Sequence, residues 1–128
     1  MKPQHNRILI VDDDSAIRIV TEATLGHLGG FEVTTAESGR AAVELCRHES
    51  FDLILIDVMM PRLDGPATVR ILRDEGLLGT VPFAFLTAKV QSDARETLLS
   101  LGATEVIAKP FDPTSLVETA RQLIDGRS

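Results

Sequence analysis

Four short runs of consecutive apolar residues limit the folds that are open to this chain. They are ILIV at residues 8–11, LILI at 53–56, FAFL at 83–86 and VIA at 106–108, with a half-polar fifth run, FEVTTA, at 31–36. A strand with one wet face alternates apolar and polar residues, whereas a strand covered on both faces is apolar throughout. The runs therefore predict five strands in a sheet whose two faces are both covered.

A segment with the period of an amphipathic helix follows each run. Five stripes repeat in this way: Ile17, Val20, Thr24 and Leu28; Ala42, Val43 and Cys46; Val69 and Leu72; Ala94, Leu98 and Leu101; and Leu116, Val117, Ala120, Leu123 and Ile124. Residue types that begin or end helices agree with these positions. They are Gly29-Gly30, Asp64-Gly65-Pro66, Gly102 and Asp112-Pro113.

Strict alternation of strand and helix predicts an α/β fold, a doubly wound parallel sheet of five strands with five helices on its two faces. The 128 residues are enough for one core and too few for two, so we expect residues 1–128 to form a single domain. The lone Cys46 lies in a helical stripe beside Ala42 and Val43, which indicates a small core residue without a redox role.

Composition excludes several classes of partner. Thirteen basic and 19 acidic residues give a net charge of -6, and Trp and Tyr are absent, which argues against direct contact with nucleic acid. No apolar run approaches the roughly 20 residues that span a bilayer, so we expect no membrane insertion. The start of the chain leads into a strand without a small-residue cleavage site, and we therefore expect a cytoplasmic protein.

Chemically active residues stand directly after the buried strands, where ligands bind in open α/β sheets. Neighbouring strands are about 4.8 Å apart, so side chains at their carboxyl ends gather in one site. The residues concerned are Asp12, Asp13 and Asp14 after the first run, Asp57 after the third, Thr87 after the fourth and Lys109-Pro110 after the fifth.

These residues fit phosphoryl transfer. Asp12, Asp13 and Asp57 would form an anionic oxygen cluster suited to Mg²⁺, which relieves the repulsion between the acids. An aspartate is a competent covalent nucleophile toward phosphorus. Lys109 and Thr87 would supply the charge and the hydroxyl that stabilise a transferring phosphoryl group.

Four motifs in this order and spacing resemble the receiver domain of response regulators in two-component signalling, of the chemotaxis-regulator type. They are VDDDSAIR, LILIDVMMPRLDG, FAFLTA and LGATEVIAKPFDP, and the resemblance covers essentially the whole chain. It implies a flavodoxin-like receiver fold with strand order 2-1-3-4-5.

The resemblance also implies a role for each matching residue of the acidic cluster. Asp57 would be the phosphoacceptor, and Asp12, Asp13, Asp57 and the backbone carbonyl of Met59 would bind Mg²⁺. Asp14 would then lie outside the metal site and help to start the first helix.

Thr87 would be the switch hydroxyl, and Lys109 would contact the phosphoryl group before a cis Pro110. A sensor histidine kinase or a phosphotransfer protein would donate the phosphoryl group. The fourth helix, fifth strand and fifth helix would then engage a downstream target protein or an output domain. A receiver domain promotes only its own phosphorylation and dephosphorylation, so we expect a switch and not an enzyme.

Two features depart from the usual receiver pattern. Val106 stands where the family usually carries an aromatic switch residue, and Thr104 and Glu105 stand where acidic residues often precede it. We hypothesise that the signal passes instead through shifts of the loop at residues 87–91 or through repacking around Val106. Met59 and Lys89, which would overhang the phosphoryl group, suggest a longer-lived acyl phosphate.

Other functions fit the sequence less well. A phosphohydrolase with an aspartyl nucleophile places it after the first strand and needs a cap. A nucleotide or flavin module would not carry three aspartates in its first loop, because they repel phosphate. A degenerate receiver that serves as a phosphorylation-independent docking module remains open, because of Val106. The sequence names no cognate kinase, target, pathway or oligomeric state, and it leaves open whether the chain stands alone.

Overall fold

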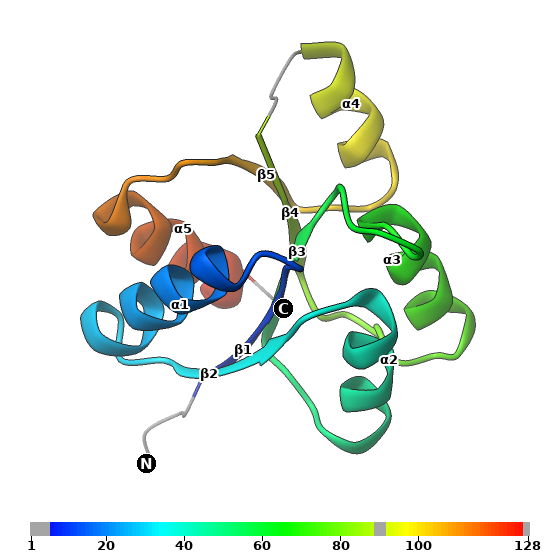
Figure 1. Cartoon of the computed structure of the whole chain (residues 1–128), viewed down its shortest axis with the longest axis horizontal. Helices are drawn as coiled ribbons and strands as arrows, with labels where there is room; N and C mark the ends of the chain where they lie inside the picture. Colours follow the sequence, from blue (N-terminus) through cyan, green and yellow to red (C-terminus); the bar gives the residue numbers. More distant parts are fainter. Residues whose placement is uncertain (1–5, 89–91, 127–128) are drawn as a thin grey trace.

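The computed structural model describes residues 6–88 and 92–126 of the chain. Within these residues a five-stranded sheet forms the centre of the molecule, and all of its strand pairs are parallel (Figure 1). The strand order is β2-β1-β3-β4-β5, as the resemblance implied. The strands are β1 (Arg7–Val11), β2 (Glu32–Ala36), β3 (Leu53–Asp57), β4 (Phe83–Thr87) and β5 (Glu105–Ala108).

Helices cover both faces of this sheet, which confirms the doubly wound arrangement. In Figure 1, α1 and α5 lie on one side of the strands, and α2, α3 and α4 lie on the other. The helices are α1 (Ser15–Ala23), which continues as the π-helical segment η1 (Thr24–Leu28), α2 (Gly39–His48), α3 (Gly65–Asp74), α4 (Ser92–Ser100) and α5 (Pro113–Asp125). None of the helices in the described part of the chain has the length and apolar character of a membrane span.

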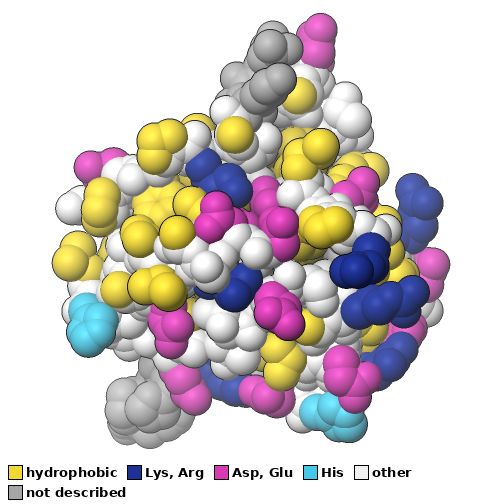
Figure 2. Space-filling view, viewed as in Figure 1, with side chains coloured by type: hydrophobic (Ala, Val, Ile, Leu, Met, Phe, Trp, Pro, Cys, Tyr) yellow, Lys and Arg dark blue, Asp and Glu magenta, His cyan; other side chains and the backbone are white. Residues whose placement is uncertain are grey.

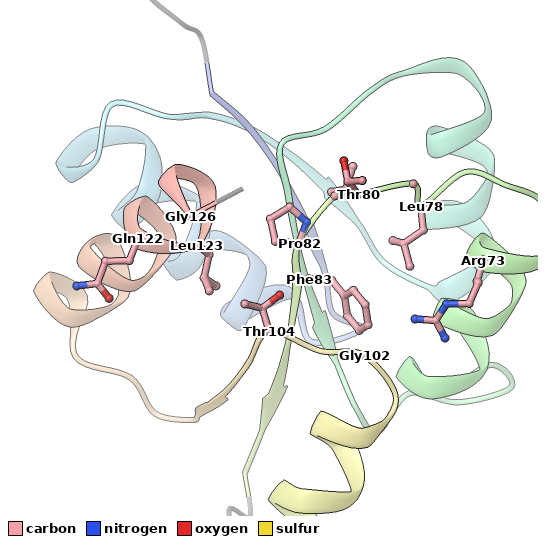
Figure 3. A pocket seen from close by; sticks show the side chains of 12 residues that line it. Arg73, Leu78, Thr80, Pro82, Phe83, Gly102, Thr104, Gln122, Leu123 and Gly126 are labelled. Carbon is pink, nitrogen blue, oxygen red and sulfur yellow. The ribbon is translucent and has the colours of Figure 1, made fainter. Parts of the chain in front are cut away.

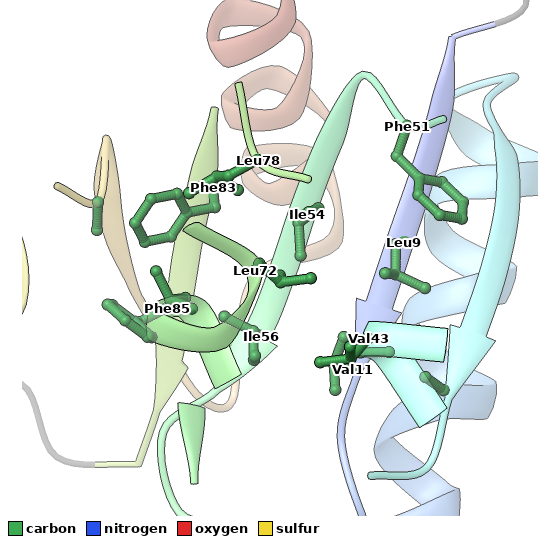
Figure 4. Close-up of a cluster of buried hydrophobic side chains, with 14 of the residues drawn as sticks. Leu9, Val11, Val43, Phe51, Ile54, Ile56, Leu72, Leu78, Phe83 and Phe85 are labelled. Atoms are coloured by element: carbon green, nitrogen blue, oxygen red, sulfur yellow. The ribbon is translucent and has the colours of Figure 1, made fainter. Parts of the chain in front are cut away.

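Alternate residues of each strand feed two separate hydrophobic clusters, one under each helical layer. Figure 4 shows the cluster under α2, α3 and α4, where Phe83 and Phe85 meet edge to face with 5.6 Å between ring centroids. The opposite cluster joins Ile8 and Leu55 to Leu25 of η1 and Leu116 of α5. Because β3 is buried along its whole length, its last residue is held in a rigid frame.

Short polar residues begin the helices as the sequence predicted. Asp14 caps α1 by accepting hydrogen bonds from the N–H groups of Ala16 and Ile17, at 2.9 and 3.4 Å. Asp64 and Asp112 cap α3 and α5 in the same way. Such caps satisfy backbone donors that have no partner inside the helix. These caps define the first residues of α1, α3 and α5, and therefore the ends of the loops that lead from the strands into these helices.

The predicted inner stripe of the first helix is wrong in part. Val20 and Leu28 are 51% and 61% exposed, whereas Thr21 and Leu25 are buried (Figure 2 shows apolar side chains at the surface on the left, where α1 lies). The hydroxyl of Thr21 donates to the carbonyl of Ile17 at 2.6 Å, so this polar residue fits the core without an unpaired group. Its neighbour Val20 is turned outward as a result.

Candidate functional site

The carboxyl edge of the sheet brings the predicted residues together. Asp12 directly follows β1, while Asp57 and Thr87 are the last residues of β3 and β4. The register pairs Asp57 with Leu86 and Thr87 with Ala108, so the ends of β3, β4 and β5 lie in sequence along one edge. Lys109 follows β5 there, and its peptide bond to Pro110 is cis. Distant segments of the chain thus meet at one place.

Three carboxylates form the centre of this site. Asp12, Asp13 and Asp57 each offer an oxygen, and these oxygens all lie within 4.8 Å of one another. Asp12 is fully buried and Asp57 is 5% exposed, whereas Asp13 faces solvent. Oδ1 of Asp12 also accepts a hydrogen bond from the backbone N–H of Asp14, at 3.0 Å. Two acids are therefore held by the fold, and the third lies at the open side.

Lys109, which directly follows β5, reaches into the cluster from the same edge of the sheet. Its Nζ lies 3.1 Å from Oδ2 of Asp12 and 3.2 Å from Oδ1 of Asp57. The lysine side chain is 15% exposed, so its charge is little screened by water. The ammonium group thus offsets part of the repulsion between two buried carboxylates. Removing it would leave both acids without a positive neighbour at hydrogen-bond distance among the described residues.

The electrostatic balance appears in the pKa values of the pair. Burial raises the pKa of the Asp57 carboxyl above its ordinary value, and the charge of Asp12 raises it further, while Lys109 acts in the opposite direction. Burial acts to lower the pKa of the Lys109 ammonium, but its hydrogen bonds and attraction to Asp12 and Asp57 outweigh this, so that pKa is raised. The protein alone leaves Asp57 short of positive charge.

A divalent cation would supply the missing charge, and the donor set fits one. Carboxylate and carbonyl oxygens are the ligands of Mg²⁺, which keeps several waters and uses few protein groups. The Met59 carbonyl, two residues after Asp57, accepts no hydrogen bond from the described residues, whereas the Val58 carbonyl is occupied by the N–H of Gly65 at 2.9 Å. Among the described residues, no donor therefore competes with a metal ion for this carbonyl, whose role as a ligand stays a prediction.

The comparison with protein families gives a direct result. A family model described as the response regulator receiver domain matches residues 8–121. This chain belongs to the receiver-domain family.

Related proteins place the receiver domain in larger regulators as well as in small proteins. The probable transcriptional regulator ycf27 of Porphyra purpurea is 39% identical over 124 residues, which make up 97% of this chain and 49% of that protein. The chemotaxis response regulator CheY4 of Vibrio cholerae has a TM-score of 0.86 at 32% identity, covering 94% of this chain and 99% of CheY4. This chain spans about half the length of the curated relatives it matches.

One similar structure is that of the receiver domain of sensor histidine kinase PA1611 from Pseudomonas aeruginosa, which has a magnesium ion coordinated in its active site cleft. Its TM-score is 0.84 at 33% identity, covering 95% of this chain and 99% of that domain.

The receiver site contains supporting residues that sequence reasoning missed. Nη1 of Arg18, in α1, donates to the backbone carbonyl of Asp12 at 2.8 Å and so steadies the loop of the acidic pair. Gly65, the first residue of α3, lies against the backbone of Asp57. The sequence offered a signal for Arg18, because a residue six positions after Asp12 lies one turn into the first helix. It offered none for the contact of Gly65 with Asp57, because the Asp64-Gly65-Pro66 motif indicates only the start of a helix.

Val106, the aliphatic residue at the position where receiver domains usually carry an aromatic, lies in β5. Val106 is buried, and its carbonyl accepts from Nη1 of Arg95 in α4 at 3.4 Å. Nη2 of Arg95 also donates to Glu105 at 2.9 Å. A charged side chain thus connects α4 to β5 next to this position. Lys89 lies outside the described residues.

An apolar pocket of about 530 Å³ lies beside the acidic cluster. Met59, two residues after Asp57, forms part of its wall, and its side chain is 77% exposed. Ala94, predicted to face the core, is exposed because α4 here borders a hollow instead of packed side chains. The pocket is lined by Val58, Met59, Thr87, Ala88, Ala94, Thr97 and Leu98.

Proposed function

We propose that this receiver domain is a phosphorylation-dependent signalling switch that takes a phosphoryl group onto Asp57 with the help of Mg²⁺. The observation that carries the proposal is the buried Asp57 carboxylate, within 4.8 Å of two further acids and 3.2 Å from Lys109. The magnesium ion in the similar PA1611 receiver domain supports the metal assignment. Asp12, Asp13, Asp57 and the Met59 carbonyl are the proposed ligands.

The transfer itself uses the chain's own groups in defined roles. A carboxylate oxygen of Asp57 attacks phosphorus as the phosphorus–nitrogen bond of a donor phosphohistidine breaks, and the imidazole keeps the bonding electrons. Lys109 then balances the negative charge on the phosphoryl oxygens, and the Thr87 hydroxyl donates to one of them. Bound Mg²⁺ supplies further charge neutralisation and orients the phosphoryl group.

The lifetime of the acyl phosphate depends on how easily water reaches it. Met59 follows Asp57 by two residues and its side chain is exposed, and an apolar side chain that overhangs the phosphoryl group would exclude water from the phosphorus. We propose that Met59 and Lys89 lengthen the phosphorylated state. Met59→Asn and Lys89→Glu variants are expected to lose the phosphoryl group faster, and unchanged half-lives would remove this assignment.

The proposed output surface is formed by α4, β5 and α5. Because Val106 lacks an aromatic ring, movement of Thr87 would reach this surface through the backbone of residues 87–91, of which 89–91 lie outside the described residues, or through repacking around Val106. Arg95, which holds α4 to β5, is placed to respond. Free and beryllofluoride-bound structures that match along α4 and β5 would contradict this route.

The proposed partners follow from the two steps of the switch, which are phosphorylation and recognition of the phosphorylated form. A sensor histidine kinase or phosphotransfer protein donates the phosphoryl group, and a target protein or output domain reads the change. The length of the ycf27 relatives supports an output domain, since the receiver accounts for about half of each. With a net charge of -6, the receiver itself is not proposed to bind nucleic acid. We place the switch in the cytoplasm and treat it as a substrate of its partners instead of an enzyme.

Intact-protein mass spectrometry after incubation with acetyl phosphate and Mg²⁺ tests the proposal. We expect a gain of one phosphoryl group, absent in Asp57→Asn and in EDTA. Asp74→Asn, a change at an exposed position of α3, is the matched control and should behave as the parent protein does. A folded, Mg²⁺-binding protein that gains no mass would favour the phosphorylation-independent docking module.

A further inference from the structure

Every polar group of Asp12 has a partner in the described part of the chain. Its backbone N–H donates to the Ala36 carbonyl at 3.1 Å, its Oδ1 accepts from the N–H of Asp14 at 3.0 Å, and its Oδ2 accepts from Nζ of Lys109 at 3.1 Å. The carbonyl oxygen accepts from Nη1 of Arg18 at 2.8 Å. Because Asp12 is fully buried, these contacts take the place of hydrogen bonds to water. Arg18 is thus one of four groups that fix this residue.

The Arg18 contact joins the first helix to the end of the first strand. Arg18 lies in the first turn of α1, and its own N–H donates to the Asp14 carbonyl at 3.0 Å. The guanidinium reaches back over this turn to the Asp12 carbonyl. No backbone N–H of the described residues donates to that carbonyl, so the loss of Arg18 would leave a buried acceptor without a partner among them. The loop that carries Asp12 and Asp13 would then lose one of its restraints.

The two cations that contact this part of the site act on different groups. Nζ of Lys109 lies against carboxylate oxygens of Asp12 and Asp57, so it offsets the charge of the acids. Arg18 contacts a backbone carbonyl and forms no ion pair with the carboxylates of the described residues. Arg18 therefore holds the loop without occupying a carboxylate oxygen that a metal ion would need.

We propose that Arg18 is a positioning residue for metal binding, which holds the backbone of Asp12 where Asp12, Asp13 and Asp57 can share one divalent cation. The inference rests on the Mg²⁺ binding proposed above. Groups that orient metal ligands from outside the coordination sphere commonly contribute about 10–100-fold to metal affinity. A charge-assisted hydrogen bond to the carbonyl of a buried ligand residue is a contact of this kind.

The sign of the effect separates positioning from a simple effect of charge. A guanidinium near the cluster repels a divalent cation, so by charge alone the removal of Arg18 would strengthen Mg²⁺ binding. If Arg18 positions the acids, its removal weakens Mg²⁺ binding instead. Arg18→Met removes both the charge and the donor, and it keeps a long, unbranched side chain at this position.

Arg73 provides a matched control at the opposite end of the sheet. Its Nη2 donates to the Leu101 carbonyl at 2.9 Å, so it also joins a helix to a backbone oxygen. Figure 3 shows Arg73 at the end of α3 beside Gly102, in a hollow at the amino ends of β4 and β5. The acidic cluster lies at the carboxyl ends of the strands. Arg73→Met therefore removes an arginine–carbonyl contact without disturbing the metal site.

Backbone amide shifts of the ¹⁵N-labelled proteins, titrated with MgCl₂ where every variant is folded, give the Kd. We expect Arg18→Met to raise the Kd about tenfold and Arg73→Met to leave it unchanged. An unchanged or lower Kd in Arg18→Met would overturn the role of Arg18, and so would an equal rise in Arg73→Met. A parent protein that binds no Mg²⁺ would overturn the metal assignment itself, and this inference with it.

Amide hydrogen exchange in EDTA tests the same role without metal. The Asp12 N–H is bonded to the Ala36 carbonyl, so its exchange reports opening of the loop, and the amide of Leu55 in the buried β3 serves as the reference for global unfolding. Relative to that reference, we expect Asp12 to exchange about tenfold faster in Arg18→Met and at the parent rate in Arg73→Met. Equal relative exchange in all three proteins would show that the loop is held without Arg18 and would overturn the proposal.

Discussion

A Cβ atom on Gly65 would lie 2.4 Å from the backbone carbonyl oxygen of Asp57. No side chain tolerates such a distance to a backbone atom, so the start of α3 and the end of β3 can approach each other only through glycine. The same residue donates its N–H to the Val58 carbonyl at 2.9 Å. The position of the proposed phosphoacceptor is therefore tied to the first residue of the next helix.

Gly65→Ala is accordingly expected to lower both stability and phosphorylation. The added methyl must push α3 or Asp57 out of place, and overpacking of this kind costs about 1–3 kcal/mol. Denaturant unfolding and the initial rate of mass gain with acetyl phosphate measure the two effects. Gly26→Ala is the control, since its Cβ would meet its nearest neighbour at 3.9 Å. A Gly65→Ala protein with unchanged stability and rate would show that the contact is not restrictive.

The acidic cluster predicts a stabilisation by Mg²⁺. An ion that binds only the folded protein raises the free energy of unfolding by roughly 1.4 kcal/mol at tenfold excess over its Kd. Asp13→Asn should reduce this gain, because it removes an exposed ligand without disturbing a buried contact. Thermal melts in EDTA and in Mg²⁺ give the comparison.

Asp14→Asn is the matched control for that experiment. Asn caps helices as well as Asp does, and Asp14 serves α1 instead of the cluster. It should lose none of the Mg²⁺ effect. If Asp13→Asn and Asp14→Asn respond alike, or if Mg²⁺ leaves the parent protein's melting temperature unchanged, the metal assignment is wrong.

The raised pKa of Asp57 predicts how stability depends on pH in the absence of metal. Burial, the largest cause, favours the protonated carboxyl in the folded state, so this state holds its proton to a higher pH than the unfolded chain, where the pKa is about 3.9. Its contribution to stability is thus complete below the unfolded pKa and is lost as pH rises through the folded pKa. Asp57→Asn should remove that loss.

Unfolding free energies of the two proteins in EDTA, measured from pH 4 to pH 7, test the sign. The Asn variant should gain on the parent as pH rises across this window. An Asn variant that is less stable than the parent near neutral pH would mean that the attraction between Asp57 and Lys109 outweighs the cost of burial. Added Mg²⁺ should reverse the order, because it binds the parent's carboxylate.

The parts of the structure that were predictable depend on local patterns. Continuous apolar runs identified the buried strands, and residues placed directly after them, such as Asp57, had to share an edge once the strands were parallel. Asp14 and Asp112 were recognised as caps because capping is a contact within one turn. The strand order came from the resemblance, since pairing between distant strands leaves no local pattern.

The features that the sequence did not predict depend on contacts between residues that are distant in the chain, or on polar groups whose hydrogen bonds lie within their own helix. Arg95 reaches β5 and Arg18 reaches the Asp12 carbonyl through long side chains whose direction no spacing reveals. Thr21 was passed over as a core residue because its hydroxyl bonds to its own helix. Gly65 looked like a helix start, and only the folded chain shows its approach to Asp57.

Cys46 provides a prediction that concerns reactivity. Burial raises the pKa of its thiol to about 11, with a further contribution from the charge of Glu49. The thiolate is the reactive form, so at pH 8 alkylation by iodoacetamide should be roughly 100-fold slower than in the unfolded chain, whose thiol has the ordinary pKa of 9.0. Mass spectrometry over time, with and without denaturant, measures both rates. Rapid labelling of the folded protein would mean that the α2 helix opens or that the thiol is not held in the core, and a redox role for Cys46 would then need a new assessment.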